Sequence, residues 1–138
     1  MIVLDTNVVS ELARSSPSRI VQRWLSQQPV FELYISAVTK AEIWYGIESL
    51  PEGRRKSQLA EDIRKIFEIG FPGQGLPFDE DAAREYSRIV AESKRLGRSL
   101  SQLDAMIAAT AKSRGAILAT RDADFGHSGI RLIIPWDE

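Results

Sequence analysis

Two short apolar runs, each followed at once by acidic residues, constrain the fold of this chain most strongly. Ile2-Val3-Leu4 stops at Asp5, and the run 116–120 stops just before Asp122 and Asp124. A run without polar alternation is typical of a strand that is covered on both faces, as in a parallel sheet. Between the two runs, apolar residues recur mainly at helical spacing. The pattern predicts an α/β fold in which helices flank both faces of a parallel sheet.

Turn residues and helix caps divide the rest of the chain into further elements. Ser16 and Pro17 are typical of an N-cap and a first helical residue, and Gly115 is typical of a helix end. We expect further strands at 33–35, 76–78 and 132–135, and helices after Ser16, over 38–50, after the turn 51–53, over 79–96 and over 101–115.

Composition limits the chemistry that is open to this protein. The chain has 138 residues, no cysteine and a single histidine, His127. A length of this order suits one domain spanning residues 1–138. Without cysteine, a disulfide scaffold, a thiol nucleophile and a cysteine-ligated zinc site are excluded. Any catalysis must therefore use carboxylates, hydroxyls, lysine or arginine side chains, or backbone groups.

The charge balance says little about partners. There are 18 basic and 19 acidic residues, which give a net charge of −1. This balance does not indicate a nucleic-acid-binding protein, and it does not exclude one, because local patches decide the matter. No apolar run approaches the length of a membrane span, and the first residues lack the basic segment of a signal peptide. We therefore expect a cytoplasmic protein without membrane association.

Five acidic residues stand out by their position. Asp5, Asp122 and Asp124 directly follow predicted strands, and in parallel sheets ligands bind in the crevice beyond the carboxyl ends of the strands. Glu42 and Asp104 lie inside otherwise apolar helical stretches. All five are therefore candidates for one functional site.

Each of these acids also has a purely structural explanation. Asp5 is a favourable N-cap for the helix that follows. Asp104 stands three residues after Ser101, the spacing of a capping box. The two acids after the second apolar run suit a surface turn, and Glu42 suits a solvated helix position. Taken singly, none of them identifies a site.

Taken together, the acids predict a divalent-metal site. Several carboxylates at one crevice repel each other unless a positive charge holds them, and Arg121 alone does not balance four or five anions. Oxygen ligands without cysteine favour Mg²⁺ or Mn²⁺ over zinc. Such an ion lowers the pKa of a bound water and stabilises negative charge that develops on a phosphate. The expected chemistry is metal-assisted hydrolysis of a phosphate ester.

Four segments carry a further signal: IVLDTNVVS (2–10), SAVTKAEI (36–43), LDAMIAATA (103–111) and LATRDADF (118–125). In their order and spacing they resemble the PIN-domain ribonucleases, and in particular the VapC and FitB toxins of bacterial type II toxin–antitoxin systems. The late Ile134-Pro135-Trp136 is similar to the family's usual Asn-Pro-Trp ending, with Ile134 in place of Asn. The resemblance covers essentially the whole chain.

The resemblance implies a twisted parallel sheet with a carboxylate site for Mg²⁺ or Mn²⁺. The matching residues are the metal-binding and catalytic acids Asp5, Glu42, Asp104 and Asp122, and the supporting residues Thr6 and Thr120. Asp124 is similar to an auxiliary acid and is a further candidate metal ligand, since either Asp122 or Asp124 could face the ion. The resemblance also implies a homodimer and a cognate VapB- or FitA-like antitoxin that neutralises the protein. Operator DNA would be bound only through that antitoxin.

The resulting hypothesis is a metal-dependent endoribonuclease. Asp5 and Asp104 would hold the ion, with Glu42 and Asp122 contributing directly or through water. A water would then attack an RNA phosphodiester, and the resemblance implies 5′-phosphate and 3′-hydroxyl products. The RNA target itself is not encoded in any pattern that we recognise.

Basic residues near the predicted site are candidates for contacts with RNA phosphates. Lys94, Arg95 and Arg98 lie just before the helix that starts near Ser101, and we predict that they contact RNA. The cluster 54–56 is also basic, but a solvated helix face explains it better.

Two other functions stay open at this point. Asp5 after a first apolar strand is faintly similar to phosphatases with an aspartyl nucleophile, but Asn7 stands where their second acid is expected. A non-catalytic module that only binds antitoxin, and operator DNA through it, is the other alternative. The retained acids argue against this second alternative.

Overall fold

Strand β1 lies in the middle of a five-stranded parallel sheet with the order β3-β2-β1-β4-β5. The computed structural model describes residues 1–98 and 100–138, which contain this whole sheet. The strands are β1 (Ile2–Leu4), β2 (Leu33–Ser36), β3 (Gly75–Leu76), β4 (Ile117–Ala119) and β5 (Leu132–Ile133). The two predicted apolar strands are direct neighbours, because Val3 of β1 pairs with Leu118 of β4. Their carboxyl ends therefore meet at the same edge of the sheet.

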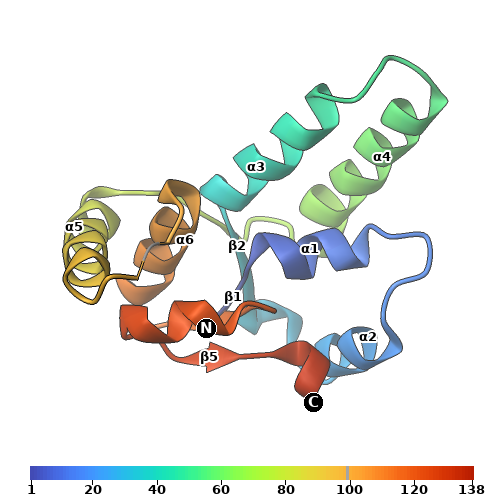
Figure 1. The fold of residues 1–138 in the computed structure, drawn as a ribbon. Helices are drawn as coiled ribbons and strands as arrows, with labels where there is room; N and C mark the ends of the chain where they lie inside the picture. Colours follow the sequence, from blue (N-terminus) through green and yellow to red (C-terminus); the bar gives the residue numbers. More distant parts are fainter. Residues whose placement is uncertain (99) are drawn as a thin grey trace.

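Helices form most of the connections between the strands (Figure 1). The α-helices are α1 (Thr6–Leu12), α2 (Arg19–Ser26), α3 (Ala37–Glu48), α4 (Arg54–Lys65), α5 (Glu80–Arg95) and α6 (Gln102–Lys112). Shorter helical segments are η1 (Val30–Glu32), η2 (Ile66–Gly70), η3 (Ala123–Ser128) and η4 (Pro135–Asp137). Within residues 1–98 and 100–138, none of the helices combines the length and the apolar character needed to cross a bilayer.

The core has two layers because successive side chains of a strand point to opposite faces. Leu4 belongs to a cluster with buried side chains of α1, α2, α3 and α4, among them Val9 and Trp24. Val3 belongs to a second cluster with Ile89 of α5 and Ala108 of α6. Figure 1 shows α5 and α6 on one side of the strands and α1 and α2 on the other. The predicted α/β fold with helices on both faces of a parallel sheet is confirmed.

The structure corrects the predicted start of α2. Ser18, not Ser16, is the N-cap: its side chain accepts a hydrogen bond from the backbone N of Val21 at 3.4 Å, and Pro17 lies before the helix. The backbone N of Ser18 donates to the Glu11 carboxylate at 3.0 Å. This contact between the loop and α1 fixes where α2 begins, and no local pattern reveals it.

Other boundaries follow the predicted caps closely. The side chain of Ser101 accepts a hydrogen bond from the backbone N of Asp104, so α6 has the predicted N-cap. Gly115 has φ +64°, a left-handed conformation that favours glycine and ends the helical region. The edge strand β3 is shorter than predicted and ends at Leu76, because Pro77 cannot donate to a ladder.

Candidate active site

Asp5 stands at the base of a cleft at the carboxyl edge of the sheet. It follows β1 and is the N-cap of α1, where its Oδ1 accepts a hydrogen bond from the backbone N of Thr6 at 2.8 Å. Its Oδ2 accepts from the Thr120 hydroxyl at 2.7 Å and from Asn7 Nδ2 at 3.2 Å. The residue is only 3% exposed. The predicted capping role of Asp5 is therefore real, and the same contacts fix its carboxylate at the cleft.

Asn7 and Thr120 tie the end of β4 to the start of α1. The Thr120 hydroxyl donates to Asp5 and accepts from the backbone N of Asp122 at 3.0 Å. The amide oxygen of Asn7 accepts from the backbone N of Arg121 at 3.1 Å. These bonds hold the segment after β4 next to Asp5. The Thr120 hydroxyl thus lies beside the Asp5 carboxylate, where a supporting role for Thr120 was predicted.

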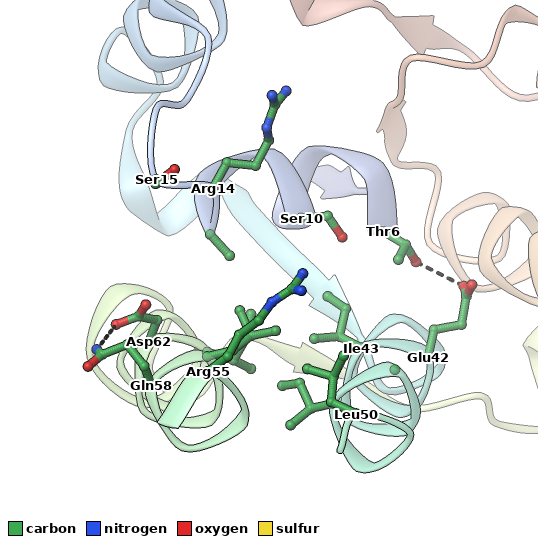
Figure 2. Close-up of a pocket in the computed structure, with 15 residues that line it drawn as sticks. Thr6, Ser10, Arg14, Ser15, Glu42, Ile43, Leu50, Arg55, Gln58 and Asp62 are labelled. Carbon is green, nitrogen blue, oxygen red and sulfur yellow. Dashed lines mark hydrogen bonds between the residues drawn. The ribbon is translucent and has the colours of Figure 1, made fainter. Parts of the chain in front are cut away.

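Glu42 reaches the same cleft from α3. Its Oε1 accepts a hydrogen bond from the Thr6 hydroxyl at 2.9 Å, as drawn in Figure 2. Thr39 of α3 also lies 3.2 Å from that hydroxyl. Glu42 is half-buried and held in place, so it is not merely the solvated helix residue that its local sequence suggests.

Asp104 enters the cleft from the first turn of α6. Its backbone N is bonded to Ser101, and its half-buried side chain lines the cleft together with Asp5 and Glu42. The cleft has a volume of about 500 Å³, and its walls also include Thr6, Asn7, Ser10, Glu11, Arg14 and Arg121. Three of the five acids predicted as metal ligands thus meet at one cleft, although they come from three different elements.

The electrostatics of the cleft disfavour charge on two of these acids. Burial raises the pKa of Asp5 to about 6; hydrogen bonds from Thr120 and Thr6 oppose the shift, and the nearby charges of Asp104 and Glu42 add to it. Burial also raises the pKa of Asp104, with the bond from Ser101 opposing and the charge of Asp122 adding. A cation in the cleft would stabilise the ionised form of these carboxyl groups.

Asp122 and Asp124 lie just outside the cleft walls. Asp122 caps η3, and its Oδ1 accepts a hydrogen bond from the backbone N of Asp124 at 2.9 Å. Asp122 is close enough for its charge to act on Asp104, whereas Asp124 is exposed. Among residues 1–98 and 100–138, no three acidic or histidine side chains have the spacing of a ready-made metal site. The acids share a cleft without being drawn tightly together.

The three basic residues predicted to contact RNA lie apart from the cleft walls. Lys94 and Arg98 line a separate pocket of about 170 Å³ at the end of α5, together with Val90, Ser93 and Leu100. Arg95 forms an ion pair with Glu92 on α5. Contacts between these residues and RNA remain a prediction.

Arg14 and Glu11 line the cleft and were not identified from the sequence. Arg14 lies 3.3 Å from the Glu11 carboxylate, which is itself 4% exposed. Their i, i+3 spacing, with Glu11 in the last turn of α1 and Arg14 just after the helix, is the only sequence signal of the pair, and that spacing is common on solvated helices. A second cavity of about 680 Å³ adjoins the cleft between α1, α3 and α4, and Arg55 points into it (Figure 2).

A model of the PIN domain family matches residues 2–129 of the chain. The chain belongs to the PIN domain family. The curated relatives of this PIN domain include "VapC ribonuclease Y4jK" from Sinorhizobium fredii, which is 40% identical over 138 residues and covered to 99% in both chains. They also include "Toxin FitB" from Neisseria gonorrhoeae, which is 37% identical with full coverage of both chains.

Solved structures give the same picture of this PIN domain. The crystal structure of FitAcB from Neisseria gonorrhoeae matches with a TM-score of 0.91 at 37% identity, covering all of both chains. The structure of FitAB bound to an IR36 DNA fragment matches with a TM-score of 0.90 at 38% identity, covering 99% of this chain and 96% of the other. The predicted family is therefore confirmed, and so is the fold.

Proposed function

We propose that this PIN domain protein is a metal-dependent endoribonuclease of the VapC and FitB type, which hydrolyses RNA phosphodiester bonds and is neutralised by a cognate antitoxin. Residues 1–138 would act as one domain. The observation that carries the proposal is the convergence of Asp5, Glu42 and Asp104 on one cleft at the carboxyl edge of the sheet. The named activities of the relatives, a ribonuclease and a toxin, agree with this chemistry.

The donor set of the cleft fits a hard divalent cation. Asp5, Glu42 and Asp104 offer only oxygen ligands, which Mg²⁺ and Mn²⁺ prefer. Burial and neighbouring like charges raise the pKa of Asp5. A cation bound beside this carboxylate would lower the pKa again, because it stabilises the ionised form. We expect Asp122 to join these ligands directly or through water, and Asp124 to act as an auxiliary acid. The bound ion would supply an activated water and would stabilise the charge that develops on the phosphate.

The chain's own residues have distinct parts in this proposal. Thr120 and Asn7 orient the Asp5 carboxylate, and Thr6 orients Glu42. The open cleft gives the phosphodiester access to these acids from solvent. Attack of water on phosphorus, with departure of the 3′-oxygen, would leave a 5′-phosphate and a 3′-hydroxyl.

The proposed partners follow from the relatives. FitB-like structures contain FitA and, in one case, DNA. We therefore propose a FitA- or VapB-like antitoxin for this chain, with operator DNA bound only through that antitoxin. A homodimer is part of the same proposal. The site of action would be the cytoplasm, where the RNA lies.

Cleavage of RNA by the purified protein tests the proposal. We expect cleavage in Mg²⁺ or Mn²⁺ that chelator abolishes, with 5′-phosphate ends on the products. Asp5→Asn should lose nearly all of this activity while keeping the wild-type fold by circular dichroism. The matched control is Asp81→Asn, which removes an exposed acid of α5 outside the cleft and should keep full activity.

Other outcomes of that experiment would contradict the proposal. Hydrolysis of phosphomonoesters without RNA cleavage would favour the phosphatase alternative. A folded protein that binds antitoxin and cleaves no RNA in either metal would favour the non-catalytic module. Full RNA cleavage by the Asp5→Asn variant would exclude the cleft as the active site.

A further inference from the structure

Two arginines line the acidic cleft, and they differ in what they contact. Arg14 lies next to the Glu11 carboxylate at 3.3 Å, so its charge is neutralised locally. Arg121 is exposed, and within residues 1–98 and 100–138 it has no carboxylate within ion-pair distance. Arg121 is therefore the cleft cation whose charge is available to a ligand.

Arg121 is held at this place from two sides. Its backbone N donates to Asn7 Oδ1 at 3.1 Å, in the same network that orients Asp5. Its guanidinium carbon lies 4.9 Å from the ring centroid of Trp136. Trp136 is half-buried in η4 and packs against the core cluster beneath α1 and α2. The aromatic platform under the arginine is therefore anchored in the core.

A guanidinium that lies over an aromatic ring still has N–H donors for another ligand, and those donors match the oxygens of a phosphate in a two-pronged arrangement. The contact with the ring also restricts the arginine side chain in advance, so less conformational freedom is lost on binding. The contact with Trp136 thus prepares Arg121 for a planar, anionic ligand group.

An anionic strand that enters this cleft needs such a cation. The walls carry Asp5, Glu42 and Asp104, and each of these repels a phosphodiester when it is ionised. We infer that Arg121, held over the ring of Trp136, forms a phosphate subsite at the rim of the cleft that positions the RNA backbone against the acids. This inference rests on the proposed ribonuclease function. It assigns a substrate-positioning role to Arg121, which is not one of the predicted site acids.

Equilibrium binding of a short single-stranded RNA tests the subsite. The measurement uses the full chain carrying Asp104→Asn, which keeps the RNA intact, over a series of salt concentrations. Adding Arg121→Ala should weaken binding by about tenfold and reduce the salt slope by about one, as for the loss of one phosphate contact. Arg121→Lys should keep the slope and recover only part of the affinity, because lysine lacks the planar fork.

Two further variants separate the subsite from general effects. Trp136→Leu should weaken RNA binding several-fold with an unchanged salt slope, because the charge remains and only its platform is lost. Arg131→Ala is the matched control: it removes an exposed arginine that does not line the cleft, and it should change neither affinity nor slope. Melting temperatures close to that of the parent chain would show that each variant is folded.

The outcomes distinguish this inference from the proposed function. If the wild-type protein cleaves RNA while Arg121→Ala binds RNA with unchanged affinity and slope, the subsite is wrong and the ribonuclease stands. If RNA binding depends on Arg121 but the wild-type protein cleaves nothing, the subsite stands and the ribonuclease is wrong. Absence of RNA binding by the parent chain overturns the subsite, and the ribonuclease is then judged by wild-type cleavage alone. Loss of antitoxin binding on Arg121→Ala, with RNA binding intact, would reassign Arg121 to the antitoxin surface and overturn the subsite.

Discussion

The hydroxyl of Thr6 in α1 donates a hydrogen bond of 2.9 Å to the Glu42 carboxylate in α3. This bond joins two elements that approach each other at the cleft, and it fixes one of the three predicted site acids that line it. Because Thr6 directly follows Asp5, the same turn of the chain orients both carboxylates.

Removal of the Thr6 hydroxyl should therefore weaken catalysis without unfolding the protein. Thr6→Val keeps the shape of the side chain and the backbone N that caps onto Asp5, but it leaves Glu42 without its donor. We expect kcat/KM for RNA cleavage to fall by about tenfold, the value of one oriented hydrogen bond. Thr6→Ser, which restores the hydroxyl, should recover most of the activity. An unchanged kcat/KM for Thr6→Val would show that Glu42 does not need this contact.

Thr120→Val should affect both stability and the titration of Asp5. The variant removes the donor to Asp5 Oδ2 and the acceptor for the backbone N of Asp122. Because this network is buried, the loss of both bonds should lower the free energy of unfolding by about 1–3 kcal/mol. Since the Thr120 bond lowers the pKa of Asp5, its loss should raise that pKa further. Urea denaturation checks the first effect, and a shift of the acidic limb of the pH–rate profile to higher pH checks the second.

Burial of Asp5 should make the metal-free protein less stable as the pH rises. The pKa of Asp5 is raised from 3.8 to about 6 in the folded chain, so between these values the folded state binds more protons than the unfolded state. The contribution of Asp5 therefore favours the folded state at low pH and is lost as the pH rises through about 6. The resulting decrease in the free energy of unfolding is at most about 3 kcal/mol.

The variant Asp5→Asn isolates this contribution. We compare the free energy of unfolding of the variant with that of wild type by urea denaturation in chelator. The value for the variant minus the value for wild type should be larger at pH 7.5 than at pH 4, which means that the variant is relatively more stable at the higher pH. Titrating groups remote from Asp5 are common to both proteins and cancel in the difference, which leaves Asp5 and the acids whose charges act on it, Asp104 and Glu42. A difference that does not change with pH would mean that Asp5 titrates normally in the folded chain.

The main features of the fold could be predicted because they depend on local patterns. The uninterrupted apolar runs identified β1 and β4, and the placement of Asp5 and Asp122 after them followed directly. Ser101 and Gly115 marked the two ends of the α6 region because capping chemistry is local. The sequence also predicted that Asp5, Glu42 and Asp104 share one site. The structure brings the three side chains to one cleft, and their catalytic and metal-binding roles stay a prediction.

The features that could not be predicted depend on contacts between distant segments. The Ser16-Pro17 pattern predicts a helix start at Ser16, whereas α2 has Ser18 as its N-cap. The contact between Glu11 and the backbone N of Ser18 exists only in the folded chain, so the local sequence does not indicate it. The cleft position of Arg14 depends on where the segment after α1 packs, and the contact of Arg121 with Trp136 requires η4 to return to the end of β4. No periodicity or spacing encodes such contacts.

Single-turnover cleavage of RNA as a function of Mn²⁺ concentration, in wild type and in Asp104→Asn, is the most direct test of a metal-dependent ribonuclease site in this cleft. We predict that the wild-type rate rises to saturation with Mn²⁺. The half-saturating concentration should increase as the pH falls below about 6, because protons compete with the ion at Asp5. Asp104→Asn, with a fold unchanged by circular dichroism, should cleave at least a hundredfold more slowly at every Mn²⁺ concentration, the order expected when a group acting at the reacting centre is removed. Equal rates for the two proteins, or a wild-type rate independent of Mn²⁺, would contradict the assignment of this cleft as a metal-dependent ribonuclease site.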